Sequence, residues 1–222
     1  MCGRIVRSSP LEAIRAEFDA TPLAPLDLRP RWNVCPSEDV LAVAPLDGVR
    51  RLRTFKWGLV LGFVPDPAAG PRPINVRAES VLARPAFRDA LRRRRCLVVA
   101  DGFYEWRRDG ATKVPYFLRL RAGHPFGLAA LWERWRGRDG TALETCAILT
   151  CAPNALVAAI HGRMPVILPR AAYARWLDPS IEDPRTLVPL LGPLPADDLE
   201  AWPVSRLVNT ASNDSPACVE PA

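Results

Sequence analysis

Short apolar runs recur through the middle of this 222-residue chain, and regular helices do not separate them. The runs at 96–100, 126–131 and 145–151 are mostly apolar, which is typical of buried strands. Parallel strands need crossover connections of a dozen or more residues, usually helical, and such connections do not alternate with these runs. The sequence therefore predicts an α+β fold with largely antiparallel pairing.

Weaker patterns complete the expected secondary structure. Gly62, Gly70 and four prolines indicate an irregular loop at 62–73. Because no linker, repeat or low-complexity tract divides the chain, we expect a single domain over residues 1–222. Further strands are expected at 40–43, 52–57, 115–121 and 166–168, and helices at 9–18, 86–95, 154–160 and 171–177.

Composition excludes several classes of protein. Apolar residues make up 49% of the chain and charged residues 24%, an ordinary globular balance. No apolar run approaches the roughly 20 residues that cross a bilayer, and the first residues lack the apolar core of a secretion signal. Six cysteines without a Cys-x-x-Cys pair, and only two histidines, argue against a zinc cluster or a disulfide framework. We therefore expect a cytoplasmic, nucleoid-associated protein with no metal, no other cofactor and no membrane partner.

The positive charge is carried almost entirely by arginine. The formal net charge is +6, and all but two of the 30 basic residues, Lys56 and Lys113, are arginines. A GC-rich genome also favours arginine, alanine and proline codons, so this composition fits either nucleic-acid binding or codon usage. The arginine block at 92–95 is expected at a solvated helix end rather than on DNA.

The first candidate for chemistry is Cys2. Removal of the initiator methionine would leave an N-terminal cysteine, whose α-amine and thiol have unperturbed pKa values of about 8 and about 8.5. Both groups would then be available as nucleophiles near neutral pH. The amine would attack an aldehyde to give an imine, and the thiol would close a five-membered thiazolidine ring. Alternatively, Cys2 is an inert packing residue, as most cysteines are.

Two titratable groups lie close to apolar segments further along the chain. Glu105 belongs to Asp-Gly-Phe-Tyr-Glu-Trp at 101–106, where aromatic neighbours would desolvate it and raise its pKa into the range useful for proton transfer. Alternatively, Glu105 is a strand residue on a solvated face. His161 lies beside Arg163, between an expected helix and an expected strand, and it either faces a ligand or ends the helix.

The run 74–80 combines an amide, a guanidinium and a carboxylate. Strand alternation would place Asn75, Arg77 and Glu79 on one face. That face is either a polar site or the solvent side of an edge strand.

These segments belong to a longer set that runs through the chain in order. The set is Met-Cys-Gly-Arg at 1–4, Arg-Trp-Asn-Val-Cys-Pro at 31–36, Trp-Gly-Leu at 57–59, Ile-Asn-Val-Arg-Ala-Glu-Ser at 74–80, Arg-Arg-Cys-Leu at 94–97, Asp-Gly-Phe-Tyr-Glu-Trp at 101–106, Leu-Trp-Glu at 131–133, Ile-His at 160–161 and Arg-Met-Pro-Val-Ile-Leu at 163–168. With this set, the chain resembles the SOS response-associated peptidase (SRAP) family over residues 2 to about 210. The joint presence of the segments favours the functional alternative at each candidate site.

The resemblance implies a fold and an activity. The implied fold is a single α+β domain with a central, mostly antiparallel, barrel-like β-structure flanked by short helices. The implied partner is single-stranded DNA containing abasic sites, held in a positively charged groove and crosslinked to the N-terminal cysteine as a thiazolidine that shields the lesion. The family name reflects autoproteolytic removal of the initiator methionine or of a short propeptide. We expect a monomer, and the sequence does not identify replication-fork proteins as partners.

Roles transfer residue by residue through the resemblance. It implies that Cys2 is the nucleophile and that Asn75 orients its amine. It implies that Glu105 transfers protons in sugar ring opening, imine formation and crosslink reversal, and that His161 assists ring opening. The arginines that correspond to positions contacting DNA phosphate or positioning the lesion are Arg4, Arg77 and Arg163.

One segment departs from the family pattern. After Trp-Gly-Leu the family continues with Ile or Val and then Pro-Ser-Trp, whose tryptophan stacks on a base, whereas this chain has Val-Leu-Gly-Phe-Val-Pro at 60–65. Either Phe63 replaces that tryptophan, or it packs into the core with Leu61 and Val64. The apolar cluster favours the core position.

Two other functions stay open on the residues alone. A thiol peptidase acting on other proteins would use Cys2 with His161 as base. A non-covalent binder of DNA or of a modified base would leave Cys2 without a chemical role. A peptidase turns over peptides, a binder leaves no adduct, and a crosslinker gives a stoichiometric, heat-stable protein–DNA species.

Overall fold

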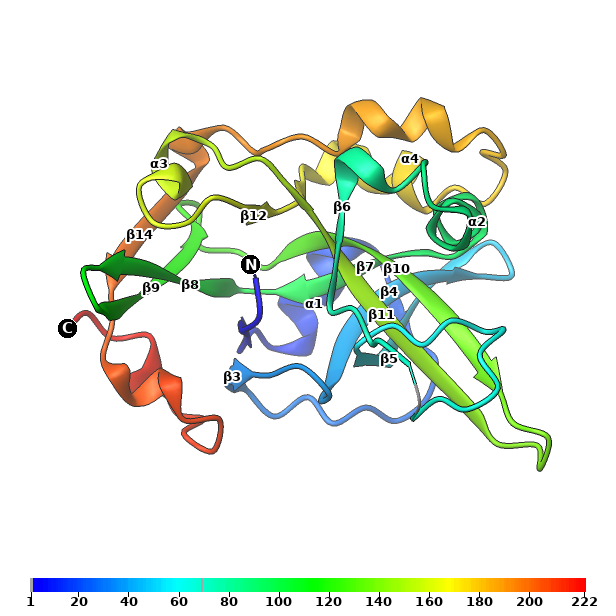
Figure 1. The fold of residues 1–222 in the computed structure, drawn as a ribbon, viewed down its shortest axis with the longest axis horizontal. Coiled ribbons are helices and arrows are strands. Elements are labelled where there is room, and N and C mark those ends of the chain that lie inside the picture. Colours follow the sequence, from blue (N-terminus) through cyan, green and yellow to red (C-terminus); the bar gives the residue numbers. More distant parts are fainter. Residues whose placement is uncertain (1, 69) are drawn as a thin grey trace.

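The computed structural model describes residues 2–68 and 70–222, and most of its secondary structure is β (Figure 1). The strands are β1 (Ile5–Arg7), β2 (Thr21–Pro22), β3 (Arg31–Val34), β4 (Asp39–Leu46), β5 (Val49–Trp57), β6 (Asn75–Arg77), β7 (Arg95–Ala100), β8 (Gly102–Asp109), β9 (Thr112–Leu120), β10 (Phe126–Arg136), β11 (Ala142–Cys151), β12 (Met164–Pro165), β13 (Ile167–Leu168) and β14 (Leu199–Pro203). The α-helices are α1 (Leu11–Phe18), α2 (Pro85–Arg93), α3 (Ala155–Ala158) and α4 (Tyr173–Leu177). Short 3-10 helices include η1 (Ala78–Ser80) and η5 (Arg206–Asn209).

Five strands close into a barrel, in the order β5–β4–β7–β10–β11. Successive pairs are antiparallel, and a short parallel pairing of β11 with β5 completes the ring at Thr145–Lys56 and Cys146–Trp57. The buried Thr145 hydroxyl supports this closure, because its Oγ1 accepts a hydrogen bond of 2.9 Å from the Val60 N–H. Closure leaves no free edge on these five strands, so the barrel is a rigid frame for the segments attached to it.

A second sheet, in the order β14–β9–β8–β1–β3, extends from the barrel. In Figure 1, β8, β9 and β14 lie to the left of the barrel strands. Gly102 is the first residue of β8 and lies where β8 and β9 come close together. A Cβ atom there would lie 2.3 Å from the Phe117 ring and 2.8 Å from the Leu118 carbonyl oxygen. Glycine is therefore required by this close approach of β8 to β9.

The residues after β14 pack on this second sheet. Val208 and Cys218 are buried in a cluster with Tyr104 and Phe117. The Trp202 Nε1–H donates to the Val219 carbonyl oxygen at 2.8 Å. The C-terminal segment is therefore part of the fold as far as the last described residues.

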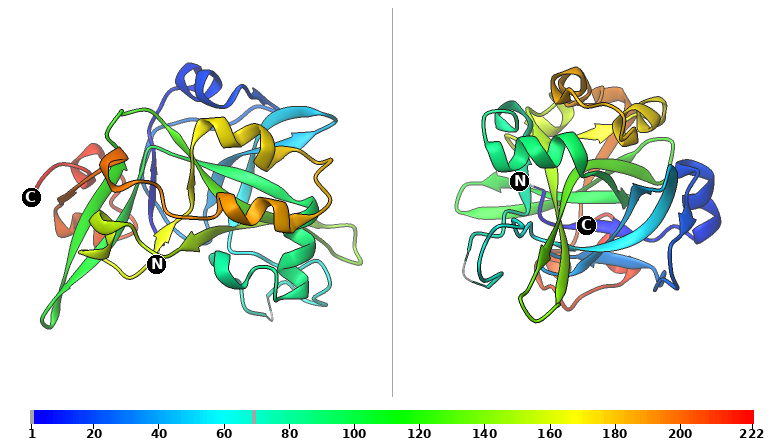
Figure 2. Two further views of the ribbon diagram at one scale, coloured as in Figure 1. Left: turned by 90° about the horizontal axis from the view of Figure 1, so that it is seen from above. Right: turned by 90° about the vertical axis from the view of Figure 1, so that its right-hand side faces the viewer.

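Helices α2 and α4 lie together on one side of the barrel, and α1 lies on another (Figure 2). Arg95, at the start of β7, connects α2 and α4. Its guanidinium donates to the carbonyl oxygens of Leu91 at 2.7 Å, Trp176 at 2.6 Å and Asp178. The expectation of a solvated arginine block was therefore wrong at Arg95, which is 3% exposed and satisfies carbonyl groups at the ends of two helices.

The α+β class and the barrel-like, mostly antiparallel β-structure are confirmed. Pro85 is the first residue of α2, and the irregular loop at 62–73 is confirmed apart from Ala69, which lies outside the described residues. The core position favoured for Phe63 was wrong, because its side chain is 76% exposed. The loop turns Phe63 away from the barrel and keeps Leu61 packed against the core. Among the helices of the described residues, none is long and apolar enough to cross a membrane.

Candidate active site

Cys2 lies at the junction of the barrel and the second sheet. Its side chain is fully buried, and its carbonyl oxygen accepts a hydrogen bond of 2.8 Å from the Asn75 Nδ2 amide. Two residues further on, the Arg4 carbonyl oxygen accepts from the Tyr104 N–H at 3.0 Å, next to Glu105. The start of the chain is therefore fixed by contacts with both β6 and β8.

Asn75 is held in place by the barrel. Strand β6 pairs in parallel with β11, with Asn75 opposite Ile148. While its Nδ2 donates to Cys2, its Oδ1 is buried and has no hydrogen-bond partner within the described residues. A buried acceptor without a partner costs free energy, and the nearby Cys2 main chain is the natural source of a donor.

Glu105 is buried on β8, with 2% of its surface exposed. Burial raises the pKa of its carboxyl group to about 7. Burial also raises the pKa of the Cys2 thiol, and the charge of Glu105 raises it further, which indicates that the two groups are close. The site therefore pairs a thiol that stays protonated with a carboxyl group that can both accept and release a proton near neutral pH.

His161 faces Glu105 from the turn after α3. Asn154 caps this helix through a 2.9 Å hydrogen bond from the Val157 N–H, and the His161 N–H donates to the Val157 carbonyl oxygen at 2.8 Å. The His161 Nδ1 lies 3.8 Å from the Glu105 Oε2. Burial lowers the pKa of His161, so the neutral imidazole predominates at neutral pH. Cys2, Asn75, Glu105 and His161, distant in sequence, are thus brought together.

The three arginines expected to contact DNA differ in their surroundings. Arg163 donates to both carboxylate oxygens of Glu79, at 2.6 and 2.9 Å, and to the Thr150 carbonyl oxygen at 2.5 Å. Arg4 donates at 2.7 Å to the Asn33 Oδ1 and at 2.7 Å to the Val208 carbonyl oxygen. Arg77 is exposed, and the part of the chain that the structure describes gives it no ion-pair partner. In this state only Arg77 is fully available to a phosphate, because protein groups occupy the other two guanidinium groups.

A cavity of about 670 Å³ opens beside Glu105 and His161. It lies along β8 beyond Tyr104, where the pairing with β1 has ended. Its lining residues are Glu105, Trp106, Arg108, Lys113, Ile160, His161, Gly162 and Asn209. Sequence reasoning missed Arg108, Lys113 and Asn209. A signal existed for Lys113, which is one of only two lysines among 30 basic residues.

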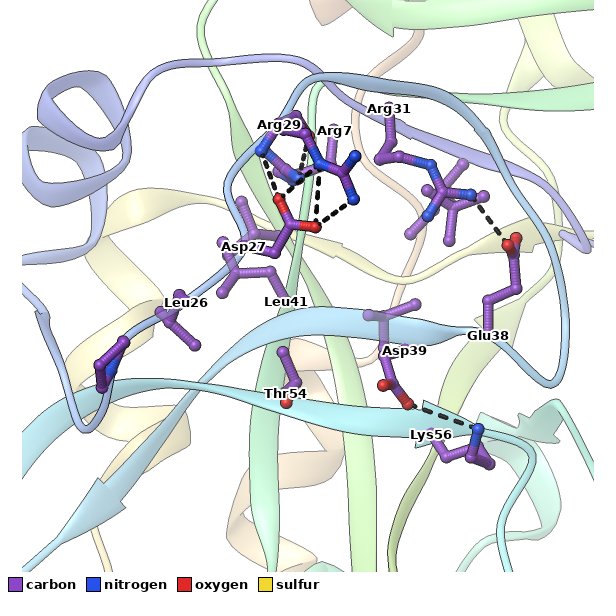
Figure 3. A pocket seen from close by; sticks show the side chains of 15 residues that line it. Arg7, Leu26, Asp27, Arg29, Arg31, Glu38, Asp39, Leu41, Thr54 and Lys56 are labelled. Atoms are coloured by element: carbon purple, nitrogen blue, oxygen red, sulfur yellow. Dashed lines mark hydrogen bonds and ion pairs between the residues drawn. The ribbon is translucent and has the colours of Figure 1, made fainter. Parts of the chain in front are cut away.

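A second cavity, of about 510 Å³, lies on the barrel away from these residues (Figure 3). Six of its charged side chains face one another in pairs: Arg29 with Asp27 at 2.6 Å, Arg31 with Glu38 at 2.9 Å, and Lys56 with Asp39 at 3.6 Å. The seventh, Arg7, is buried and donates to two main-chain carbonyl oxygens. Because these groups already have partners, this cavity offers little to a charged ligand. Elsewhere in the described chain, no three His, Cys, Asp or Glu side chains are grouped so that they could hold a metal ion.

Comparison with known proteins identifies the family of this chain. The family model described as SOS response associated peptidase (SRAP) matches residues 1–211, and the chain belongs to that family. It is 40% identical over 222 residues to the Abasic site processing protein YoqW of Bacillus subtilis (strain 168), with 99% of each chain covered. It is 30% identical over 227 residues to the Abasic site processing protein YedK of Escherichia coli (strain K12), with both chains covered completely. A crystal structure of a Bacteroides thetaiotaomicron protein has the same fold, with a TM-score of 0.89, 26% identity and complete coverage of both chains.

Proposed function

We propose that this protein is a DNA-repair protein that binds single-stranded DNA and crosslinks itself to abasic sites through Cys2. Relatives at 30% and 40% identity are named abasic site processing proteins, which supports the lesion as the substrate. The observation that carries the chemistry is the burial of Cys2 beside a carboxyl group whose pKa is about 7. Removal of Met1, by the protein itself or by an aminopeptidase, exposes the α-amine that the reaction needs.

The proposed reaction converts an aldehyde and an aminothiol into a thiazolidine and water. The Cys2 amine attacks C1′ of the open-chain sugar, and the resulting carbinolamine loses water to give an imine. The thiol sulfur then adds to the same carbon while the nitrogen gains a proton. No oxidant or reductant is needed, because C1′ keeps the same oxidation level from the aldehyde to the thiazolidine.

Glu105 is the group that moves the protons. The pKa of the Cys2 thiol is raised by burial, so the thiol carries its proton when it reaches the imine. A carboxylate at Glu105 accepts that proton as the C–S bond forms, and the acid form returns a proton to the nitrogen. A carboxyl group with a pKa of about 7 serves in both directions, which also permits crosslink reversal.

Asn75 and His161 act on either side of Glu105. The unpartnered Asn75 Oδ1 is suited to accept a hydrogen bond from the Cys2 amine, which directs the nitrogen lone pair toward the aldehyde. His161, neutral and 3.8 Å from the carboxyl group, is suited to protonate or deprotonate the sugar hydroxyl during ring opening. Arg77 is exposed at the end of β6 and is suited to bind a backbone phosphate.

The same geometry disfavours a thiol peptidase. A catalytic thiol needs a lowered pKa, usually from a nearby imidazolium or other cation. Burial and the charge of Glu105 both raise the pKa of the Cys2 thiol. A neutral His161 does not compensate for either effect.

The test is a denaturing gel of the protein with a single-stranded abasic oligonucleotide, together with the intact mass of the protein. We expect loss of one methionine and a stoichiometric, heat-stable adduct. Cys2→Ala, which keeps an amine but lacks the thiol, should give no stable adduct while retaining phosphate-driven affinity for DNA. Cys35→Ala, at another buried cysteine, is the matched control and should crosslink normally. An undiminished adduct with Cys2→Ala contradicts the mechanism.

A further inference from the structure

Two positive charges face each other at the mouth of the 670 Å³ cavity. Arg108 on β8 and Lys113 on β9 are direct cross-strand partners, and both line the cavity together with Glu105 and His161. Like charges directly opposite each other on antiparallel strands are destabilising. The hairpin formed by β8 and β9 therefore contains a pair of like charges that lowers its own stability.

No carboxylate relieves this repulsion among the described residues. Both side chains are exposed, and neither has an ion pair or hydrogen bond there. The neighbouring Arg107 points to the opposite face of β8 and lies over the Tyr116 ring, 5.0 Å from its centroid. Asp109 is the last residue of β8 and has no ion pair with either cation among the described residues, and Glu105 is buried at the cavity. Two cations are thus left to face the solvent at the rim.

The wall of the rim next to the two cations is fixed. The Trp106 Nε1–H donates to the Asn209 Oδ1 at 2.8 Å, and Asn209 belongs to η5, which Arg4 holds through the carbonyl oxygens of Val208 and Asn209. Trp106 lies on the same face of β8 as Arg108, two residues away. The two cations are therefore presented beside a rigid aromatic and amide wall.

We propose that Arg108 and Lys113 together bind a DNA backbone phosphate next to the abasic nucleotide. This inference rests on the proposed function, because an abasic nucleotide that approaches Glu105 and His161 through this cavity must bring its flanking phosphates to the rim. A planar guanidinium and a flexible ammonium on adjacent strands can both donate hydrogen bonds to one phosphodiester. The negative charge of the phosphodiester attracts both cations and so offsets the repulsion between them. Arg4 and Arg163 are held by protein groups, so the hairpin supplies phosphate-binding charges that the family resemblance did not assign.

The test measures how binding to a single-stranded oligonucleotide with a stable abasic analogue depends on salt. The variants are Arg108→Gln, Lys113→Gln and the double variant, and the matched control is Arg138→Gln in the exposed turn between β10 and β11. For single strands, each lost phosphate contact lowers the slope of log K against log salt by about 0.7. Because the pair neutralises one phosphate, we expect a decrease of about 0.7 for the double variant and a smaller decrease for each single variant, with an unchanged slope for Arg138→Gln. Lys113→Arg, which keeps the charge, should bind as the wild type does.

Thermal unfolding separates this role from a structural one. Removal of one of two facing cations should leave the melting temperature unchanged or raise it. An unchanged salt slope in the double variant overturns the phosphate site, as does a slope that falls only together with the melting temperature. If the wild type crosslinks normally while the slope is unchanged, the rim assignment alone is wrong. If the wild type gives no adduct, the proposed function is wrong.

Discussion

At the scale of single residues, Glu105 is where function and stability oppose each other. Its pKa is raised by burial from about 4.5 to about 7, so the folded protein keeps a proton that the unfolded chain releases between these pH values. The free energy of unfolding therefore falls as pH rises through this window, and the full penalty applies above it. The proton-transfer role that we propose for Glu105 therefore comes with a loss of stability at its site.

Glu105→Gln is expected to gain stability and lose activity. At pH 8 the amide avoids the burial of a charge, which should increase the free energy of unfolding by on the order of 1–3 kcal/mol. The difference should disappear below about pH 4, where the wild-type carboxyl group is mostly protonated in both the folded and the unfolded state. Crosslink formation and reversal should slow by about 10²–10⁴-fold. The measurements are urea unfolding of the wild type and the variant at the two pH values, and crosslinking rates from gels. If the variant has the stability of the wild type at pH 8 and crosslinks at the wild-type rate, Glu105 has a purely structural role.

The site residues differ in how far the sequence could assign them. The aromatic neighbours of Glu105 indicated desolvation, and the raised pKa confirms that direction. The hydrogen bonds that occupy Arg4 could not be predicted in the same way, because its partners lie 29 residues away at Asn33 and 204 residues away at Val208. Short-range patterns report local burial, whereas long-range hydrogen bonds depend on the finished topology.

At the scale of elements, β8 needs a residue without a side chain at its first position. Gly102→Ala would place a Cβ 2.3 Å from the Phe117 ring and 2.8 Å from the Leu118 carbonyl oxygen, so β8 and β9 must separate. We expect a loss of about 1–3 kcal/mol in the free energy of unfolding, as for other overpacked sites. Slower crosslinking should accompany it, because Glu105 lies three residues further along β8. Gly110→Ala, in the exposed turn between β8 and β9, is a control for added bulk, because a Cβ atom there would have no other atom within 4 Å. The φ of 58° at Gly110 adds some backbone strain to this control. Wild-type stability of Gly102→Ala would contradict the close packing of the two strands.

The loop at 62–73 provides a second test at this scale. Phe63 is exposed, so Phe63→Ala should change the free energy of unfolding by no more than about 0.5 kcal/mol. If the ring stacks on a base in place of the absent tryptophan, affinity for single-stranded DNA should fall by about 1–3 kcal/mol, with the crosslinking step unchanged. Fluorescence anisotropy with a labelled oligonucleotide measures this. Wild-type affinity would show that this loop does not stack on the DNA.

The elements were predictable where their pattern is local. The apolar run at 96–100 lies within β7, and the expected strands at 126–131 and 145–151 lie within the longer β10 and β11. The expected helix at 154–160 is shorter, because α3 ends at Ala158 and a turn follows. Four other strands, β1, β3, β6 and β14, are short or lie at sheet edges, and their sequences show no clear periodicity. They are strands because they pair with segments that are distant in the sequence.

At the scale of the whole molecule, Asn33 connects the two ends of the chain. It is fully buried, its Oδ1 accepts from Arg4, and its Nδ2 lies within hydrogen-bond distance of the carbonyl oxygens of Val208, Thr210 and Asn213, at 3.2, 3.1 and 2.8 Å. The segment that it holds includes Asn209, which lines the cavity beside Glu105. Arg4, two residues after Cys2, and the wall of the cavity beside Glu105 are therefore held by one amide.

Asn33→Leu tests whether this connection makes the chain one cooperative unit. Leucine matches the amide in size but removes one hydrogen-bond partner from Arg4 and the amide donor from the carbonyl oxygens of the C-terminal segment, so we expect the free energy of unfolding to fall by on the order of 3 kcal/mol. If residues 1–222 form a single domain, the wild type and the variant should each unfold in one transition, with tryptophan fluorescence and far-UV circular dichroism giving the same midpoint. Asn213→Ala, which removes a half-buried amide bonded to the Leu207 carbonyl oxygen, is the milder control within the same segment. Separate midpoints for the two probes in the wild type would mean that the C-terminal segment unfolds independently. In that case the wall of the cavity would open without loss of the barrel, and crosslinking would decline at lower denaturant than the barrel signal does.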